Sequence, residues 1–412
     1  MGTLGGGSAF SITTTPQSKI GFEVPIFDSS PTRGAEALRA PYRGDKPEFA
    51  EERYVMSVHE ILMWAMAAFA GLGALDRIFG IRLGLGERFE EGIQSMGSLA
   101  LAMVGIIAIA PVLAEVLKPV VVPVYEFLGA DPAMFAGTIL ASDMGAAPLA
   151  DALTADAQAA AFGGVLCGSM LGATIVFSIP VALGILEKED RPALAKGMLA
   201  GIVTIPVGLL VGGLVAGFSI GMILRNLVPV LLIAGLIGLG LWKWEKALIT
   251  GFGWFGKGII ALITVGLAAV LVQTLTGFVL IPGLAPVEEA FQTVGTIALV
   301  LAGAFPLVLV LTKLLKKPLM KLGSLLGIND KAAAGLIASL ANSIATFGMV
   351  KQMDERGKVV NIAFAVSAAF VFGDHLGFTA GYAPQMLPAV IVGKLSGGVA
   401  AVAVALMITK KA

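Results

Sequence analysis

An acid and a histidine stand side by side in an apolar segment, within the run Gly373-Asp374-His375-Leu376-Gly377. The surrounding segment, 359–383, is long and apolar enough to lie within a membrane. A charged side chain at the centre of a bilayer costs about 2.5–3.5 kcal/mol on insertion scales, so it is retained where a partner or a function requires it. The flanking glycines allow the backbone to leave the helix and expose polar groups to a ligand. These residues are the first candidates for a binding site.

Asp374 and His375 need not act together. Neighbouring side chains on a regular helix point about 100° apart, so one can face a cavity while the other holds a neighbouring helix. A carboxylate at membrane depth can serve as the counter-ion of a bound cation. A histidine can titrate near neutral pH or act as a fixed donor. A structural alternative remains open, in which Asp374 forms an ion pair with a lysine such as Lys394.

Polar residues also interrupt three other apolar segments. Segments 130–150 and 329–350 are short and broken, and Pro180 predicts a break in segment 158–186. Backbone that leaves the helix at membrane depth is tolerated where it is buried or lines a cavity, so side chains there can bind a ligand. They can also satisfy backbone groups or join helices. The candidate ligands at these interruptions are Asp143, Asn342, Ser343, Thr174 and Ser178.

Motifs of enzymes and cofactor sites offer no competing chemistry. The run 217–221 matches the spacing of a nucleophile elbow, but it closes an apolar helical segment rather than a strand. Metalloprotease, P-loop and dinucleotide-binding motifs do not occur. Cys167 is the single cysteine, which excludes an internal disulfide and a cysteine metal site. We therefore expect neither an enzyme nor a cofactor or metal site.

The composition is that of a multi-pass membrane protein. Hydrophobic residues make up 57% of the chain and charged residues 14%, against about 25% charged in soluble domains. The formal net charge of zero argues against nucleic acid as a partner. The 53 glycines suggest closely packed helices. Four pairs have the four-residue spacing of such contacts: Gly168 and Gly172, Gly208 and Gly212, Gly377 and Gly381, and Gly393 and Gly397.

The apolar segments repeat along the chain. Membrane spans are expected near 58–79, 93–117, 158–186, 192–217, 222–242, 247–276, 291–315, 359–383 and 386–408. Residues recur at an offset of 198, as in the pairs Gly97 and Gly295, Gly137 and Gly335, Ser169 and Ser367, and Lys196 and Lys394. The offset holds together with matching hydropathy, which indicates an internal duplication.

Loop charges predict that the two copies are inverted. Basic residues concentrate in loops 313–321, 351–358 and 187–196, which places these loops in the cytoplasm. Segment 329–350 must then enter and leave on one side, as a re-entrant hairpin. The counterpart loop 151–157 is acidic and is expected outside.

We expect an all-α integral membrane protein with an inverted-repeat transporter fold. It would have about nine spanning helices plus two re-entrant, broken-helix hairpins, or alternatively ten to eleven spans. The predicted parts are a flexible N-terminal extension (1–55), a first membrane repeat (56–218), a linking helix (219–246) and a second repeat (247–412).

From Met56 onward the chain resembles the ethanolamine utilisation transporter family, EutH. The resemblance rests on long strings spread over most of the chain, among them 89–92, 123–126, 174–184, 199–206, 351–354 and 373–378. It implies a multi-pass permease of the bacterial inner membrane that imports ethanolamine. The substrate would be a small protonated amino alcohol, which suits a buried carboxylate.

The site that the resemblance implies draws on the same candidates. Asp374 or Asp143 would hold the ammonium group, and Phe372 or Phe378 would offer it an aromatic face. Asn342, Ser343, Thr174 or Ser178 would supply polar contacts, and His375 would act as a proton site, gate or strut. A coupling proton or sodium ion remains open. So do two other functions: an ion-coupled transporter of another small amine or amino acid, and an intramembrane enzyme acting on ethanolamine head groups.

Overall fold

The computed structural model describes residues 56–410, without the side chains of 242, 245 and 249. The predicted N-terminal extension, 1–55, lies outside the described residues. Within 56–410, every regular element is a helix, as the sequence predicts. The helices are α1 (Val58–Ile78), α2 (Leu85–Phe127), α3 (Ala133–Ile139), α4 (Ala146–Leu153), α5 (Ala157–Ala160), α6 (Ile179–Ile185), α7 (Arg191–Ile202), α8 (Ile205–Val215), α9 (Ile220–Lys243), α10 (Glu245–Thr276), α11 (Val287–Leu326), α12 (Asp330–Ala341), α13 (Ser343–Met349), α14 (Glu355–Ala368), α15 (Asp374–Tyr382) and α16 (Leu387–Ile408).

Eight helices among the described residues are long and apolar enough to cross a membrane. They are Val58–Ile78, Leu85–Phe127, Ala157–Ile185, Lys188–Val215, Ile220–Leu241, Lys246–Thr276, Val287–Leu326 and Pro384–Ile408. The ninth expected span, 359–383, is divided into α14 and α15 by a non-helical segment at 369–373. Backbone of this kind is tolerated at membrane depth only when it is buried or faces a cavity.

The break predicted at Pro180 is wrong. Helical structure continues from Ala157 to Ile185, and Pro180 stands in the first turn of α6. Two π-helical stretches precede it, η2 (Ala161–Gly172) and η3 (Thr174–Ser178). In a π-helix each amide donates to the carbonyl five residues earlier instead of four. This change in hydrogen bonding allows the helix to accommodate the proline without ending. Such π-helical turns are frequent at functional sites.

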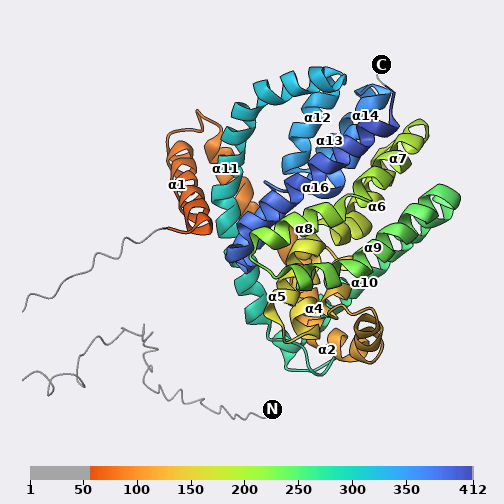
Figure 1. Ribbon diagram of the computed structural model, residues 1–412. Coiled ribbons are helices and arrows are strands. Elements are labelled where there is room, and N and C mark those ends of the chain that lie inside the picture. The colour runs from red at the N-terminus through yellow and green to blue at the C-terminus, as the bar shows by residue number, and fades with distance from the viewer. Residues whose placement is uncertain (1–55, 411–412) are drawn as a thin grey trace, which may run out of the picture. The chain divides into compact units, whose positions relative to one another are not determined.

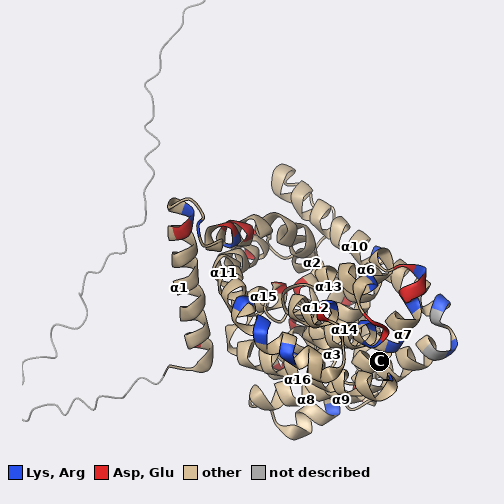
Figure 2. Ribbon diagram, turned by 90° about the horizontal axis from the view of Figure 1, so that it is seen from above, with Lys and Arg blue, Asp and Glu red and all other residues tan. Residues whose placement is uncertain are grey.

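The helices after α2 and those after α11 follow one another in the same order. Each long helix leads into a hairpin of short helices, α3 and α4 in the first half and α12 and α13 in the second. Two further helical passes follow in each half. The hairpin α12–α13 lies at the end shown at the top of Figure 1, and α4 lies toward the opposite end. Figure 2 looks onto the end that carries α12–α14 and shows lysine and arginine positions around it.

Close glycine contacts join the two halves of the molecule. A Cβ atom on Gly208 of α8 would lie 2.8 Å from the carbonyl oxygen of Gly393 in α16. Conversely, a Cβ on Gly393 would lie 2.8 Å from the carbonyl oxygen of Gly208. A Cβ on Gly208 would also lie 3.3 Å from the Cα atom of Gly397. The predicted role of these glycine pairs in helix packing is confirmed.

Substituting Gly393 by leucine is expected to destabilise the protein by at least about 1–3 kcal/mol, because the larger side chain forces α8 and α16 apart. Thermal unfolding of the purified protein in detergent measures the effect. Gly235 of α9 provides the matched control, since a Cβ there meets nothing within 4 Å in the described part of the chain. Equal melting temperatures for Gly393→Leu and Gly235→Leu would contradict the packing assignment.

Candidate functional site

The break between α14 and α15 is held by the tip of the hairpin α12–α13. The Phe370 amide donates to the Ser339 carbonyl at 3.0 Å, and the Phe372 amide donates to the Leu340 carbonyl at 2.8 Å. Phe370 adopts a left-handed conformation with φ of 62°. This strained backbone is stabilised by the two hydrogen bonds to the hairpin. The hairpin α12–α13 therefore stabilises the break between α14 and α15.

Gly373 allows the closest approach at this break. A Cβ at this position would lie 2.1 Å from the Ala341 carbonyl oxygen, so any larger residue would push the hairpin away. Asp374 follows directly as the first residue of α15. The break and the close approach of the hairpin at Gly373 together set the position of this carboxylate.

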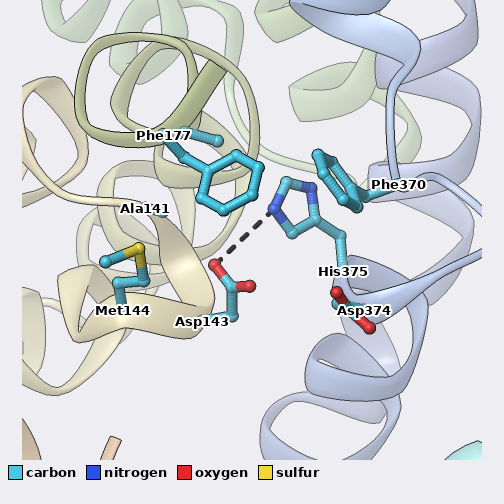
Figure 3. Close-up of a pocket in the computed structure, with 8 residues that line it drawn as sticks. Ala141, Asp143, Met144, Phe177, Phe370, Asp374 and His375 are labelled. Carbon is cyan, nitrogen blue, oxygen red and sulfur yellow. Dashed lines mark ion pairs between the residues drawn. The ribbon is translucent and has the colours of Figure 1, made fainter. Parts of the chain in front are cut away.

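Asp143 and His375 come together from the two halves of the chain. Asp143 lies in the short 3-10 turn η1 (Ser142–Met144), which separates α3 from α4. Its Oδ1 is 3.6 Å from His375 Nε2, as Figure 3 shows. The His375 side chain is 3% exposed and that of Asp143 20% exposed. A protonated imidazole would form an ion pair here, and a neutral one leaves the carboxylate charge largely unmatched.

Two phenylalanines surround the imidazole. Phe370 lies with its ring centroid 5.2 Å from that of His375, and Phe177 packs edge-on against Phe370 at 5.5 Å (Figure 3). A cavity of about 30 Å³ lies among these side chains, room for a water molecule or two. Ala141, Met144, Ala173, Asp143 and Asp374 complete its lining. Aromatic faces beside a carboxylate are typical of sites for organic cations.

Asp374 borders two larger cavities as well. One, of about 560 Å³, is also lined by Arg88, Glu91, Asn342 and Phe372. The other, of about 570 Å³, reaches Asp143, Phe177 and Lys257. Within residues 56–410, the Asp374 carboxylate has no hydrogen-bond or ion-pair partner. A carboxylate that faces three cavities without a partner offers a charge to a ligand.

Several buried polar atoms beside the cavities also lack partners. Among the described residues, Ser142 Oγ, Asp143 Oδ1, Ser343 Oγ and His375 Nδ1 are buried and make no hydrogen bond. An unpaired buried donor or acceptor costs about 1–3 kcal/mol, so native proteins rarely leave such atoms unmatched. Their concentration at η1, at the hairpin tip and at α15 indicates a place where a polar ligand or water completes the bonding.

The remaining predicted ligands differ in their positions. Asn342 lines the 560 Å³ cavity, but its Oδ1 accepts the Ile344 amide at 2.7 Å and thereby caps α13. Thr174 Oγ1 donates to the carbonyls of Met170 and Val366. Among the described residues, Thr174 and Ser178 line none of the three cavities. The structure brings Asp143, Asp374 and His375 together, with Asn342 at the cavity wall and Thr174 and Ser178 behind the site.

The alternative ion pair between Asp374 and Lys394 does not form among the described residues. The Lys394 side chain is buried, at 1% exposure, and its Nζ donates to the Ser169 carbonyl at 2.5 Å. Sequence reasoning missed this role, although a lone lysine within the apolar segment 386–408 was a signal. It named Phe372 or Phe378 for the aromatic face, whereas Phe370 lies against the imidazole and Phe177 packs on Phe370.

Polar contacts join the two halves at both ends of the site. At one end, Lys351 Nζ lies 2.7 Å from Glu187 Oε1. Lys358 lies 2.7 Å from both Asp190 and Glu355. Partial burial lowers the pKa of Lys358, but its hydrogen bonds to the two carboxylates outweigh this and raise the pKa overall. The two halves therefore meet through charge pairs at this end.

At the other end, a hydrogen bond connects the first hairpin to α15. The Tyr382 hydroxyl donates to Asp151 Oδ2 at 2.5 Å. Asp151 belongs to α4, and Tyr382 is the last residue of α15. The Asp143–His375 pair lies on the same two segments, so the hairpin is attached to α15 at two points. In the part of the chain that the structure describes, no group of three or more His, Cys, Asp or Glu residues could hold a metal ion.

Comparison with known proteins places this architecture in a family. The family model for the ethanolamine utilisation protein EutH matches residues 58–408. A protein named probable ethanolamine permease EutH from Listeria monocytogenes is 60% identical over 356 residues, covering 86% of this chain and 95% of the relative. Its namesake from Salmonella typhimurium is 51% identical, covering 86% of this chain and 97% of the relative.

A third relative carries no functional name. This Bacillus subtilis protein, named uncharacterized protein YxeR, is 52% identical over 354 residues, covering 86% of this chain and 96% of the relative. No solved structure matches the chain. The names given to the Listeria and Salmonella relatives describe transporters rather than enzymes. With the apolar helices and the match over 58–408, these findings show that the chain is an integral membrane protein of the EutH family.

Proposed function

We propose that the protein is a permease for ethanolamine, which it binds as the protonated amine at Asp374. The observation that carries this proposal is the unpaired Asp374 carboxylate at the helix break, where three cavities meet. A primary amine is protonated near neutral pH, by analogy with lysine at about 10.4. A carboxylate in a site of low dielectric is the natural partner for that charge. The names of the Listeria and Salmonella relatives support ethanolamine as the substrate.

The second carboxylate completes the site in this proposal. Asp143 and Asp374 line two of the cavities together, so a cation bound there would relieve the repulsion between two carboxylates. Phe177 and Phe370 offer aromatic faces to the same cation. The substrate hydroxyl would meet the unpaired groups at the hairpin tips, Ser142 and Ser343, or the Asn342 amide. Each half of the chain then contributes one acid and one hairpin to the site that binds the substrate.

Alternating access between two inverted halves is the proposed transport mechanism. Three observations support it: the repeated order of elements, the two broken hairpins, and the contacts between halves at both ends of the site. Glu187 and Lys351 both belong to loops whose charge predicts a cytoplasmic location. Asp151, which accepts the Tyr382 hydroxyl, belongs to the loop 151–157 that is expected on the outer side. Substrate sites at the interface of such repeats are typical of secondary transporters.

Cysteine labelling tests the inverted arrangement. We expect a cysteine at the exposed Ala155 to react with a membrane-impermeant maleimide in intact cells, and one at the exposed Gln352 to react only after permeabilisation. The unmodified chain is the control, because its single Cys167 is buried. Labelling of both positions from the same side would contradict the inversion.

Competition in membrane vesicles separates ethanolamine from other substrates. We expect unlabelled ethanolamine to block uptake of labelled ethanolamine far more strongly than amino acids or amines without a hydroxyl do. Stronger competition by one of those compounds would favour a transporter of another small amine or amino acid. Imposed proton and sodium gradients in the same vesicles identify the coupling ion.

The proposed location of the protein is the bacterial inner membrane.

A further inference from the structure

Two serines of α2 lie where the two larger cavities meet. Among the described residues, Ser95, Ser98 and Asp374 line both the 560 Å³ and the 570 Å³ cavity. Gln94 and Thr312 also carry acceptor oxygens, but they line the 560 Å³ cavity and not its neighbour. A ligand that moves from one cavity to the other therefore passes the two serines and the Asp374 carboxylate together.

Helix α11 brings α2 and α15 together at this point. A Cβ atom on Gly92 of α2 would lie 2.5 Å from the carbonyl carbon of Leu301. A Cβ on Gly377 of α15 would lie 2.2 Å from Cδ2 of the same leucine. Ser95 lies one helical turn after Gly92, and residues with this spacing share a helix face. Asp374 lies one turn before Gly377. Contacts with a single residue of α11 thus place the serines and the carboxylate around the same cavities.

The hydroxyl groups of both serines can only accept hydrogen bonds from a ligand. Ser95 Oγ donates its proton to the Gly92 carbonyl at 2.6 Å, and Ser98 Oγ donates to the Ser95 carbonyl at 2.8 Å. A serine hydroxyl has one proton and two lone pairs. No residue within the described part of the chain donates to either oxygen. Each oxygen therefore has lone pairs available at the cavity wall and no proton left to offer.

We propose that Ser95 and Ser98 are specificity-determining residues that select primary ammonium groups by accepting their N–H bonds. A primary ammonium group has three N–H donors, and a single carboxylate does not meet all of them. A trimethylammonium group has none. Hydrogen bonds from a charged donor are stronger than neutral ones, so these acceptors favour the ligand with N–H groups. This inference rests on the proposed binding of a protonated amine at Asp374 and adds the substitution on nitrogen that the site accepts.

Ethanolamine and choline test this selection, because they share a hydroxyl group and a single positive charge and differ in their N–H donors. The charge of Lys257, which lines the 570 Å³ cavity, acts on both ligands alike. Competition against labelled ethanolamine on the purified full chain gives the ratio of their affinities. We expect the wild-type protein to favour ethanolamine by at least about tenfold. Equal affinities in the wild type would overturn the proposal.

Substitutions then assign the selection to the serine oxygens. The double variant Ser95→Ala/Ser98→Ala removes both acceptors, so ethanolamine should bind at least about tenfold more weakly while choline binds as before. Ser95→Thr/Ser98→Thr keeps both oxygens and should keep the preference. Ser324→Ala is the matched control. The exposed Ser324 Oγ also donates to a carbonyl three residues earlier, that of Lys321 at 2.7 Å, and it lines none of the three cavities.

The two affinities also show whether the serines act through hydrogen bonds or through size. An unchanged ratio in the double alanine variant would overturn the proposal. So would a ratio that falls because choline binds more tightly, since the serines would then only limit size. An equal change in Ser324→Ala would overturn it as well.

The same experiment distinguishes this inference from the proposed function. If the wild-type chain binds no labelled ethanolamine, the proposed function and this inference fail together. If ethanolamine binds and choline competes as well as unlabelled ethanolamine does, the function stands and the role of the serines fails.

Discussion

Replacing Asp374 by asparagine is expected to lower ethanolamine uptake by at least about a hundredfold while leaving the protein folded. Removing one partner of a buried charge pair costs about 3–5 kcal/mol, and each 1.4 kcal/mol is about tenfold in affinity. The carboxylate has no partner within residues 56–410, so its loss breaks no internal bond. Uptake of labelled ethanolamine into membrane vesicles and thermal unfolding in detergent measure the two parts of this prediction.

Two further variants sharpen this test. Asp330→Asn removes an exposed acid at the start of another helix, α12, and is expected to leave uptake unchanged. Asp374→Glu keeps the charge on a longer side chain and is expected to retain part of the uptake. Unimpaired uptake by Asp374→Asn would show that this carboxylate is not the counter-ion of the substrate.

Asp143→Asn is expected to have the second-largest effect, a loss of uptake of about tenfold or more. The substitution removes one of the two carboxylates at the site and the group that faces His375 across 3.6 Å. If Asp143 and His375 act as a unit, the double variant Asp143→Asn/His375→Gln should be about as impaired as the worse single variant. Vesicle uptake for the four proteins of this double-mutant cycle gives the coupling. Effects that simply multiply would show that the two residues act separately.

The sequence predicted the helices well because the apolar segments leave few alternatives. Backbone groups in a bilayer must be paired within the chain, so long apolar runs form helices whatever their neighbours. The glycine pairs on α8 and α16 were also readable, since close helix packing needs small residues at this spacing. These features depend on local composition, which a single sequence displays.

Helix breaks were harder to predict because they depend on distant contacts. The unusual run Gly373–Gly377 indicated the break before α15, but its geometry depends on hydrogen bonds from Phe370 and Phe372 to a hairpin some 30 residues earlier in the chain. At Pro180 the sequence predicted a break that the structure does not contain. A proline usually ends a helix, and here the π-helical turns before it allow the helix to continue.

The sequence could not predict how the site residues group together, because this grouping also depends on distant contacts. Asp143, Asp374 and His375 were each found as polar residues in apolar surroundings, without any indication that Asp143 would face His375. Lys394 was found as a possible ion-pair partner, but its burial against Ser169 depends on how α16 crosses η2. Thr174 was predicted as a ligand but does not line the cavities. Its hydroxyl bonds to backbone carbonyls behind the site, which no local pattern distinguishes from ligand binding.

Uptake of labelled ethanolamine by proteoliposomes that contain only the purified protein shows directly whether this chain transports ethanolamine. We expect saturable entry well above that of protein-free liposomes, lost in Asp374→Asn and retained in Asp330→Asn. Proton and sodium gradients imposed in turn cover both candidate coupling ions. Entry equal to that of protein-free liposomes under every gradient would contradict the assignment of this chain as an ethanolamine permease.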